Sequence, residues 1–265
     1  MEILGAPVAT LEVAADQPVA LIAVRLNDVA PGGASTRVTY GLLNLTHRDS
    51  HEQPEPLEPG KRYRIRMTMN DVAYAFPAGH KLRLAISTSY WPIAWPAPQP
   101  VTVSLFTGES FVDLPVRPPD PRDLALRPFE PPERAAAETT ELRPAPLKRI
   151  VESDRTTNET IYTVSSGRGD LDGAKLTRIK AIGLEVGHTM LKHFRIGEED
   201  PEMAQAEVIQ KTRFRRGAWK TRVETHTRFS SSTDDFVLEA ELTAYEDDEV
   251  IFTRTWTRRI KRDLI

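Results

Sequence analysis

The stretch that decides the fold is Tyr74-Ala-Phe76-Pro77-Ala-Gly79-His80-Lys81-Leu82-Arg83-Leu84-Ala-Ile86-Ser87-Thr-Ser89-Tyr90-Trp91-Pro92-Ile-Ala-Trp95-Pro96. From Lys81 to Thr88 the side chains alternate between polar and apolar, a period of two that is typical of a half-buried β-strand. Pro77 and Gly79 predict a turn before this strand, because proline presets φ and glycine accepts positive φ. The repeated prolines after Tyr90 exclude a central strand there. We therefore predict one buried strand between a turn and a stiff aromatic loop.

Shorter strands are predicted on both sides of this stretch, at 8–13, 19–26, 36–45, 61–70 and 101–106. The run at 19–26 is almost continuously apolar, which suits a strand inside a sandwich. A turn is expected from Asp28 to Gly33, with the Asp28 side chain bonding backbone amides two residues on. Short strands joined by turns, without a helical pattern, indicate a β-sandwich.

Four motifs in this half carry a family resemblance. They are Phe76-Pro-Ala-Gly-His-Lys-Leu-Arg-Leu84 with Trp91-Pro92, Val24-Arg-Leu-Asn-Asp-Val-Ala-Pro-Gly-Gly33, Tyr40-Gly-Leu42 and Pro59-Gly60. In this order they resemble the C-terminal domain of the Xaa-Pro dipeptidyl-peptidase and cocaine-esterase-like (CocE/NonD) hydrolases. The resemblance covers Ile3 to about Pro118. Gly217-Ala-Trp219 and Arg262-Asp-Leu264 look like a tail that some members carry.

The resemblance implies a jelly-roll (galactose-binding-like) β-sandwich that serves as an accessory domain of an α/β-hydrolase. The hydrolase domain, which holds the catalytic Ser, Asp and His in the family, is expected to be missing from this chain. Its nucleophile sits at a Gly-x-Ser-x-Gly elbow. The nearest match is Gly33-Ala-Ser35-Thr-Arg37, which lacks the second glycine and lies in a turn. We therefore expect no catalytic residues here and an α/β-hydrolase domain as the partner, carried upstream or on a separate chain.

Composition narrows the function classes further. The 265 residues carry a formal net charge of −3, which argues against binding to nucleic acid or to an anionic membrane surface. They include no cysteine, which argues against a thiolate metal site and a thiol nucleophile. The amino-terminal sequence lacks the basic and apolar regions of a signal peptide, and no apolar run approaches a membrane span. We expect a chain without cofactor or metal that is soluble and, by default, cytoplasmic.

A proline-rich segment divides the chain, with nine of the 21 prolines between Pro115 and Pro146. Such density favours an extended, semi-rigid conformation. We favour an ordered strap, with Leu124, Leu126 and Phe129 along a domain surface, over a free tether. The predicted organisation is a jelly roll at 1–116, the strap at 117–147 and an antiparallel β domain at 148–265. Either half is long enough to bury its own core.

The second half predicts a meander of long strands. Alternating segments lie at 160–164, 176–186, 208–214, 219–229, 236–244 and 250–260. Asp200-Pro201 is a plausible start of a short helix, with aspartate as N-cap and proline at the first position. A basic set accompanies these strands: Lys211, Arg213, Arg215, Arg216, Lys220, Arg222 and Arg228. We favour cross-strand ion pairs with Glu224, Glu239 and Glu241 over a nucleic-acid surface.

Two polar clusters could carry chemistry. His80 follows Gly79 at the start of a strand, and for Asp28, Gly33, Gly79 and His80 we favour a structural role over catalysis, which would need a nucleophile and an orienting carboxylate. His47, Asp49 and His51 have metal-like spacing, but a solvated loop is favoured over a rigid zinc site. For Asp28 a turn cap is favoured over a calcium ligand.

The aromatic residues Tyr90, Trp91 and Trp95 are the candidate surface for a ligand or partner. We expect their rings to be exposed, and favour docking to a partner domain over binding of a sugar or apolar ligand. The function predicted is a non-catalytic C-terminal region that caps or orients a serine hydrolase domain. The alternatives are a free-standing carbohydrate- or ligand-binding β-sandwich and an enzyme with its own unrecognised site. A homo-oligomer remains open.

Overall fold

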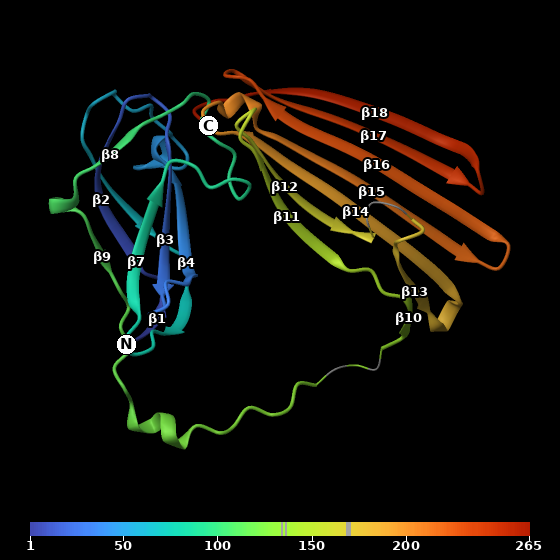
Figure 1. Ribbon diagram of the computed structural model, residues 1–265, viewed down its shortest axis with the longest axis horizontal. Coiled ribbons are helices and arrows are strands. Elements are labelled where there is room, and N and C mark those ends of the chain that lie inside the picture. Colours follow the sequence, from blue (N-terminus) through green and yellow to red (C-terminus); the bar gives the residue numbers. More distant parts are fainter. Residues whose placement is uncertain (134, 136, 168–170) are drawn as a thin grey trace. The chain divides into compact units, whose positions relative to one another are not determined.

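The computed structural model describes residues 1–133, 135, 137–167 and 171–265. They form two compact units, Met1–Pro131 with Leu264–Ile265, and Pro132–Asp263. Both units consist of antiparallel strands and short 3-10 helices (Figure 1). The predicted all-β fold class is therefore confirmed. In the part of the chain that is described, no helix has the length and hydropathy to cross a membrane.

The first unit is a sandwich of two small sheets and a short ribbon. One sheet has the order β5-β2-β8, with β9 also on β2; the other has the order β4-β3-β7; and β1 pairs with β6. The strands are β1 (Glu2–Gly5), β2 (Val8–Ala15), β3 (Leu21–Val29), β4 (Ser35–Asn44), β5 (Tyr63–Thr68), β6 (Val72–Ala75), β7 (Lys81–Ser87), β8 (Val103–Leu105) and β9 (Phe111–Asp113). The 3-10 helices are η1 (Leu45–His47), η2 (Thr107–Glu109) and η3 (Pro121–Ala125).

The core of this unit lies between β2, β3 and β5. Leu11, Ile22, Leu26 and Ile65 are each at most 1% exposed and belong to one hydrophobic cluster. Burying such a side chain stabilises the fold by about 1.5–3 kcal/mol. The apolar run predicted as an interior strand is β3, flanked on both sides by other strands. The pattern therefore located the centre of the sandwich.

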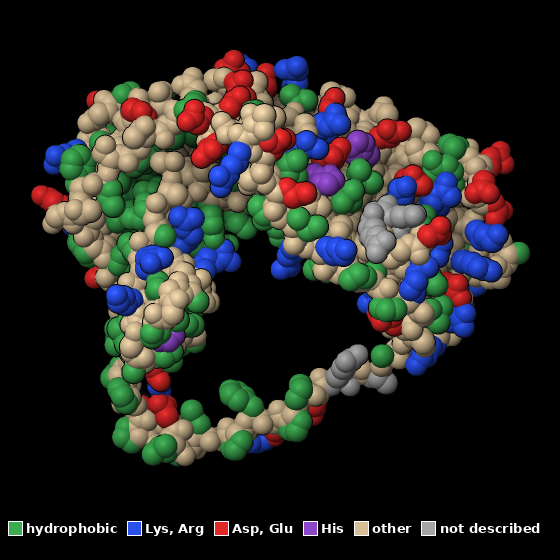
Figure 2. Space-filling view, in the orientation of Figure 1, with side chains coloured by type: hydrophobic (Ala, Val, Ile, Leu, Met, Phe, Trp, Pro, Cys, Tyr) green, Lys and Arg blue, Asp and Glu red, His purple; other side chains and the backbone are tan. Residues whose placement is uncertain are grey.

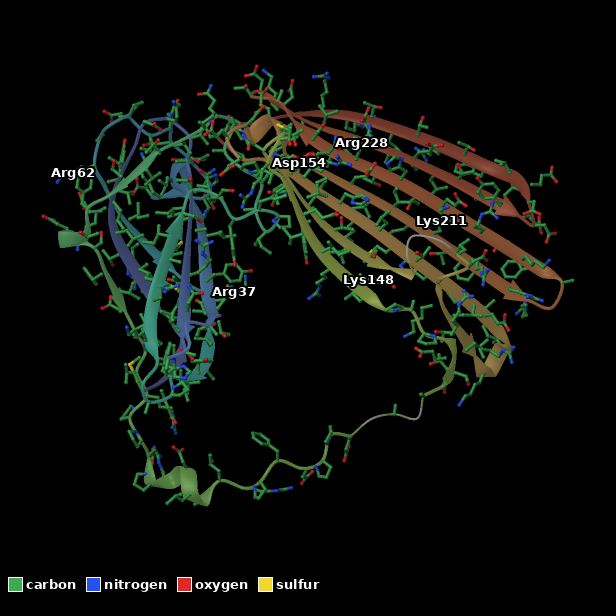
Figure 3. The ribbon with its side chains drawn as sticks, viewed as in Figure 1. Arg37, Arg62, Lys148, Asp154, Lys211 and Arg228 are labelled. Carbon is green, nitrogen blue, oxygen red and sulfur yellow. The ribbon has the colours of Figure 1, made fainter. Side chains whose placement is uncertain are left out.

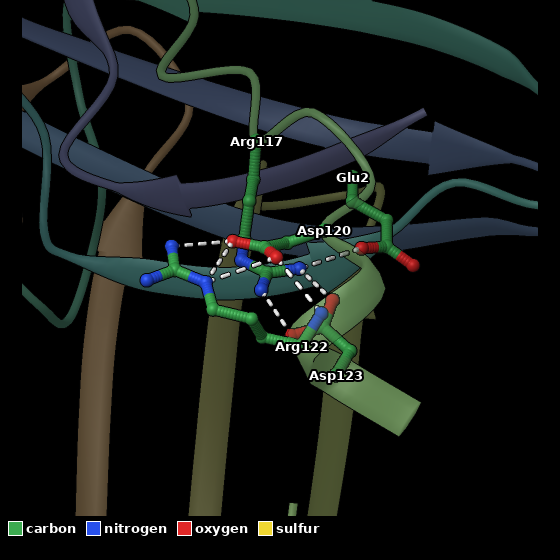
Figure 4. A network of polar contacts seen from close by, with 5 residues as sticks. All are labelled: Glu2, Arg117, Asp120, Arg122 and Asp123. Carbon is green, nitrogen blue, oxygen red and sulfur yellow. Dashed lines mark hydrogen bonds and ion pairs between the residues drawn. The ribbon is translucent and has the colours of Figure 1, made fainter. Parts of the chain in front are cut away.

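The proline-rich segment begins as an ordered extension of the first unit. Leu4 N–H donates to Pro115 O at 2.9 Å and Arg117 N–H donates to Glu2 O at 2.9 Å, which joins the segment to β1. The Nη1 atom of Arg117 donates to Asp123 at 2.8 Å and also lies 3.7 Å from a carboxylate oxygen of Glu2 (Figure 4). Asp120 caps η3 by accepting from the Arg122 backbone amide. This end of the segment is therefore held by backbone pairing as well as by charge.

The expectation that apolar side chains of the strap line a domain surface is wrong. Leu124, Leu126 and Phe129 are 94%, 70% and 103% exposed. The prolines around these residues limit regular structure to the short 3-10 helix η3, so the three side chains do not form one face that could pack. A strand, β10 (Thr139–Arg143), also forms within the segment, in a stretch that contains no proline.

The second unit is one nine-stranded sheet. Its order is β10-β13-β14-β15-β16-β17-β18, with β12 also on β14 and β11 on β12 (Figure 1). The other strands are β11 (Leu147–Asp154), β12 (Glu159–Ser166), β13 (Lys175–Ile179), β14 (Leu184–Gly197), β15 (Gln205–Arg216), β16 (Trp219–Ser231), β17 (Asp235–Glu246) and β18 (Glu249–Lys261). The 3-10 helices are η5 (Lys180–Ile182) and η6 (Pro201–Met203), the latter capped by Asp200 as predicted.

The two faces of this sheet differ in chemistry. Residues opposite one another in the ladder share a face, and one face carries Glu207, Lys211, Arg222, Glu224, His226, Arg228, Glu239 and Glu241. We call it the ion-paired face. The other, the apolar face, carries Val208, Phe214, Val223, Leu242, Ala244 and Phe252.

This unit does not bury a core of its own. Among its described residues, the hydrophobic side chains that are fully buried are Ala174 and Ala204. The expectation that either half would bury its own core is therefore wrong for the second half. The physical reason is that a single sheet layer needs a second layer to cover its apolar face, and no described element of this unit supplies one.

Candidate functional site

Tyr90 anchors the loop at 88–102, which connects β7 to β8. Its ring packs edge-on against Tyr40 at 5.6 Å, and the Arg25 guanidinium lies 4.8 Å from the ring centroid. Arg37 donates a hydrogen bond to the Tyr90 hydroxyl, and its guanidinium also lies 4.7 Å over the Tyr40 ring. Cation–π contacts of this kind hold both partners in place. Residues from β3 and β4 therefore fix the start of the loop.

The two tryptophans form the body of the loop. Their ring centroids are 5.0 Å apart at an interplanar angle of 80°, an edge-to-face pair. A turn supports them, with the amides of Ile93 and Ala94 both donating to Tyr90 O. The expectation of exposed rings is wrong, because Trp91 and Trp95 are half-buried. The exposed apolar side chain of the loop is Ile93, at 51%.

A slot of about 390 Å³ opens beside this loop, between the two sheets of the sandwich. Its lining is mostly apolar: Ile22, Ile86, Ser87, Thr88, Val101, Thr102, Val103 and Leu105. β7 and β8 are end strands of the two facing sheets, so the slot marks an open seam of the sandwich. Its volume falls in the range of ligand pockets, about 300–1,000 Å³.

The opposite seam is closed. There β4 and β5 approach one another, and the Asn70 amide donates to Tyr40 O at 3.0 Å while the Thr39 hydroxyl donates to Asn70 O at 2.8 Å. Gly41 allows this approach, because a Cβ at that position would lie 3.3 Å from both the Thr68 carbonyl and the Met67 sulfur. The sandwich is thus joined along one edge and open along the other.

A second polar cluster joins β3 to the turn before β7. The Asp28 carboxylate accepts from the Tyr74 hydroxyl at 2.7 Å and lies 2.8 Å from His80 Nδ1. Burial is the largest influence on the Asp28 pKa and raises it, but the hydrogen bonds from Tyr74 and His80 and the charge of His80 outweigh it, so the pKa is lowered. The hydrogen bond to Asp28 raises the pKa of Tyr74. The cluster therefore holds Asp28 ionised.

This geometry corrects one sequence interpretation and supports another. Asp28 does not cap a turn; it lies within β3, and its acceptors face Tyr74 and His80. His80 also closes its own turn through the backbone, donating to Pro77 O at 3.3 Å. Gly33 and Gly79 both have positive φ, 86° and 80°, as turn positions require. These contacts hold β3 and the turn before β7 together, and the structural role favoured for the four residues stays a prediction.

The histidine-rich loop after η1 holds one close pair. The Nδ1 atoms of His47 and His51 are 3.4 Å apart, and Asp49 forms an ion pair with Arg48 at 3.2 Å instead of joining them. Within the described ranges, no group of three or more His, Cys, Asp or Glu side chains is placed to hold a metal ion.

Three basic residues of the second unit form ion pairs with glutamates. Lys211 lies 3.8 Å from Glu224, Arg222 lies 2.8 Å from Glu224, and Arg228 lies 3.8 Å from Glu239. Lys211 and Arg228 project from neighbouring strands (Figure 3). Basic and acidic side chains interleave over this unit (Figure 2). The contacts Lys211–Glu224 and Arg228–Glu239 join neighbouring strands, so the prediction of cross-strand ion pairs is confirmed for these two, whereas Arg222 and Glu224 both lie on β16.

Comparison with known proteins finds a family match for most of the first unit. Residues 1–122 match the model of the X-Pro dipeptidyl-peptidase C-terminal non-catalytic domain. This part of the chain is similar to that domain family. The resemblance found in the sequence motifs is thereby confirmed over the jelly-roll half of the chain.

Two of the solved structures that match part of this chain are a hydrolase and an aminopeptidase. An α-amino acid ester hydrolase is 22% identical over 44% of this chain, with a TM-score of 0.42. An aminopeptidase from a marine sediment Thaumarchaeota archaeon is 19% identical over 43% of this chain, with a TM-score of 0.41. The chain spans 23% of the length of either protein. No curated protein sequence matches it.

Sequence reasoning missed two features of the first unit. One is the slot, which depends on residues 22 and 105 meeting across two sheets. The other is the pair of arginines that hold Tyr90. A signal for the second was present: Arg25 interrupts an otherwise apolar interior strand, and a charge in such a place needs a partner.

Proposed function

We propose that this chain is a non-catalytic accessory region that docks on an α/β-hydrolase domain and caps or orients it. The observation that carries the proposal is the match of residues 1–122 to a domain family described as non-catalytic. Such a domain acts through a catalytic domain, carried upstream on the same polypeptide or on another chain. The absence of a Gly-x-Ser-x-Gly elbow from the sequence agrees with this role.

The open seam supports docking at the aromatic loop. Protein interfaces are anchored by aromatic and aliphatic side chains that fill pockets and exclude water. Here an apolar slot opens beside the loop between β7 and β8, and this loop carries the exposed Ile93 and the edge-to-face pair of tryptophans. The slot can receive a side chain of the hydrolase, and Ile93 can enter a pocket on it. We therefore assign the docking surface to this loop and slot.

Ile93→Asp is the sharpest test of the docking surface. Ile93 is exposed, so the substitution should leave the melting temperature unchanged, whereas Trp91→Ala would also remove a half-buried ring. Loss of an interface anchor costs about 2 kcal/mol or more, so affinity should fall roughly 30-fold. The measurement is calorimetric titration with the α/β-hydrolase domain encoded next to this chain. Leu4→Asp, at a side chain of similar exposure on β1, is the control and should bind normally.

Three outcomes would contradict the proposal. If the wild-type chain does not bind the hydrolase domain, the accessory role is wrong. Equal affinities for Ile93→Asp and Leu4→Asp would move docking away from the loop. Binding of saccharides that Trp91→Ala abolishes, without any binding of the hydrolase, would favour the carbohydrate-binding module instead.

A further inference from the structure

The strand β18 ends the nine-stranded sheet on one side. It pairs with β17 over its whole length and with no other described strand. Every residue of β18 is exposed except Trp256, which is half-buried. Thirteen residues make an edge of about 43 Å, along which alternate backbone amides and carbonyls point outward. An edge of this kind is a template for pairing with another chain.

The sequence of this edge is self-complementary about Thr255. Written outward from that residue, Arg254 and Trp256 lie one step away, Thr253 and Thr257 two steps, and Phe252 and Arg258 three steps. If an identical strand is laid antiparallel beside it with Thr255 opposite Thr255, each arginine faces an aromatic ring and threonine faces threonine. Cross-strand pairs of these types stabilise antiparallel sheets.

We propose that two copies of this chain associate through β18, in antiparallel pairing about a two-fold axis at Thr255. The central segment Phe252–Arg258 of each copy would form the new ladder and join the two sheets into one. This association is independent of hydrolase docking, because it uses the second unit alone. An isologous interface of this kind is the commonest in homo-oligomers.

Side-chain placement in the structure suits this pairing. Arg254 and Trp256 lie opposite Leu242 and Ala240 of β17, so both project on the apolar face. The Arg254 guanidinium already lies 5.0 Å from the centroid of the Trp256 ring in the same strand. A second copy adds another such contact on each side of the axis. The apolar face of one copy then continues into that of the other.

Charge selects this register over its neighbours. A shift by two residues in one direction places Arg254 opposite Arg254 of the second copy. A shift in the other direction places Arg254 opposite Arg258 of the second copy. Like charges directly opposite are destabilising. Shifts by one residue would set the apolar face of one copy against the ion-paired face of the other.

The length of the pairing segment is limited by an irregularity near one end of β18. The register with β17 shifts between Ala244 and Tyr245. Ala244 lies opposite Phe252 and Tyr245 lies opposite Val250, so one residue of β18 is skipped between them. Regular alternation therefore holds from Phe252 onward. The seven residues from Phe252 to Arg258 still exceed the usual strand length of about 5–6 residues.

A single cysteine tests the axis directly, because the chain contains no other. Directly opposite residues in an antiparallel ladder have Cα atoms about 4.5–5.5 Å apart, within the range that a disulfide spans. Mild oxidation of Thr255→Cys should give a covalent dimer in high yield. Ile150→Cys, at the exposed β11 edge on the other side of the sheet, should remain uncrosslinked. Equal crosslinking of both variants, or none of Thr255→Cys, overturns the proposal.

Charge at the axis gives a second test that does not depend on oxidation. Sedimentation velocity of the wild type at micromolar concentration should give twice the chain mass of 29.8 kDa. Thr255→Lys and Thr255→Asp should each sediment as monomers, since each repels its own copy across the axis. Their equimolar mixture should regain the dimer, because position 255 faces itself in only this register. Thr140→Lys, on the exposed strand β10, should stay dimeric.

The remaining outcomes are equally decisive. A monomeric wild type overturns the proposal, and so does a dimer that persists in Thr255→Lys. Far-ultraviolet circular dichroism identifies a variant that fails to fold. In that case the crosslinking of Thr255→Cys still decides the question.

Discussion

Asp28 illustrates how a single side chain ties distant segments of the first unit together. Its two carboxylate oxygens face Tyr74 of β6 and His80 of the turn before β7, residues that are 46 and 52 positions away. The carboxylate is 5% exposed, so water contributes little to its solvation. Hydrogen bonds from the hydroxyl and the imidazole replace that solvation, and they are stronger because the acceptor is charged.

The first prediction is that Asp28→Asn destabilises the chain at neutral pH and less so in acid. The folded-state pKa of Asp28 lies below its ordinary value of 3.8. Its ionisation therefore adds stability that is complete above that value and is lost as the pH falls through the folded pKa. Urea midpoints of wild type and variant should differ most near neutral pH, and the difference should shrink as the pH falls below 3.8. The exposed carboxylate variant Asp71→Asn should track the wild type throughout. A gap that is constant with pH would rule out an ionised Asp28.

At the residue scale, a feature could be predicted from the sequence when it depends on neighbouring residues, and not when it depends on contacts between distant ones. The positive φ of Gly33 and Gly79 could be predicted, because a turn is decided by a few neighbouring residues. The role of Asp28 could not, because its partners come from elsewhere in the fold. Read locally, the same residue looked like a turn cap. The half-burial of Trp91 and Trp95 was missed for the same reason.

At the scale of elements, the closed seam depends on the approach of β4 to β5. Gly41 is buried, and a Cβ there would lie 3.3 Å from the Met69 Cα, the Thr68 carbonyl and the Met67 sulfur. Two of these three atoms belong to the backbone of the opposing segment and cannot rotate away. A side chain at this position must therefore push the two sheets apart or distort the strand.

Gly41→Val is predicted to destabilise the first unit by roughly 1–3 kcal/mol, the usual effect of overpacking a well-packed interior. Gly32→Val is the matched control, since nothing lies within 4 Å of its Cβ position and its φ is not in the left-handed region. Urea unfolding of both variants gives the comparison. If the two variants unfold at the same midpoint, the closed seam does not depend on Gly41.

The predictability of elements followed their length and regularity. The long alternating segments that became β15 to β18 were all identified, because many residues agree on one period. The short strands β1, β6 and β9 were missed, since three or four residues carry almost no periodic signal. β11 was missed although it has eight residues, because its charged and apolar residues do not alternate regularly. The slot beside the aromatic loop follows from topology rather than from any one segment.

At the scale of the whole molecule, the two units are stabilised in different ways. The first has an apolar cluster enclosed by two sheets. The second is a single layer with an ion-paired face and an apolar face, and its described residues bury only small hydrophobic side chains. Surface ion pairs contribute little stability individually, about 0–1 kcal/mol each. Covering the apolar face and extending the sheet are therefore the ways in which the second unit can gain stability by association.

The end of the chain belongs to the first unit. Leu264 O accepts hydrogen bonds from the Asn44 side-chain amide at 2.7 Å and from the Thr46 hydroxyl at 3.0 Å, across 220 and 218 positions of sequence. Thr46 is 1% exposed, so water cannot readily replace the carbonyl. Leu264 accepts a φ of 59° to present that carbonyl, a conformation that is unfavourable for a residue with a side chain. The contact is thus formed despite backbone strain.

Removal of Leu264 and Ile265 is accordingly predicted to destabilise the first unit by roughly 1–3 kcal/mol, because a buried hydroxyl loses its acceptor. Leu264→Gly keeps the carbonyl and adopts positive φ without strain, so it should be at least as stable as the wild type and should exceed the truncated chain by that same margin. The Thr46→Val background sharpens the test: with the donor gone, truncation should have a much smaller effect, and the difference is the coupling energy of the pair. Urea unfolding of the wild type, the truncated chain, Thr46→Val and the truncated Thr46→Val chain completes this double-mutant cycle. Truncation that is equally damaging with and without the Thr46 hydroxyl would show that these last residues act through something other than this hydrogen bond.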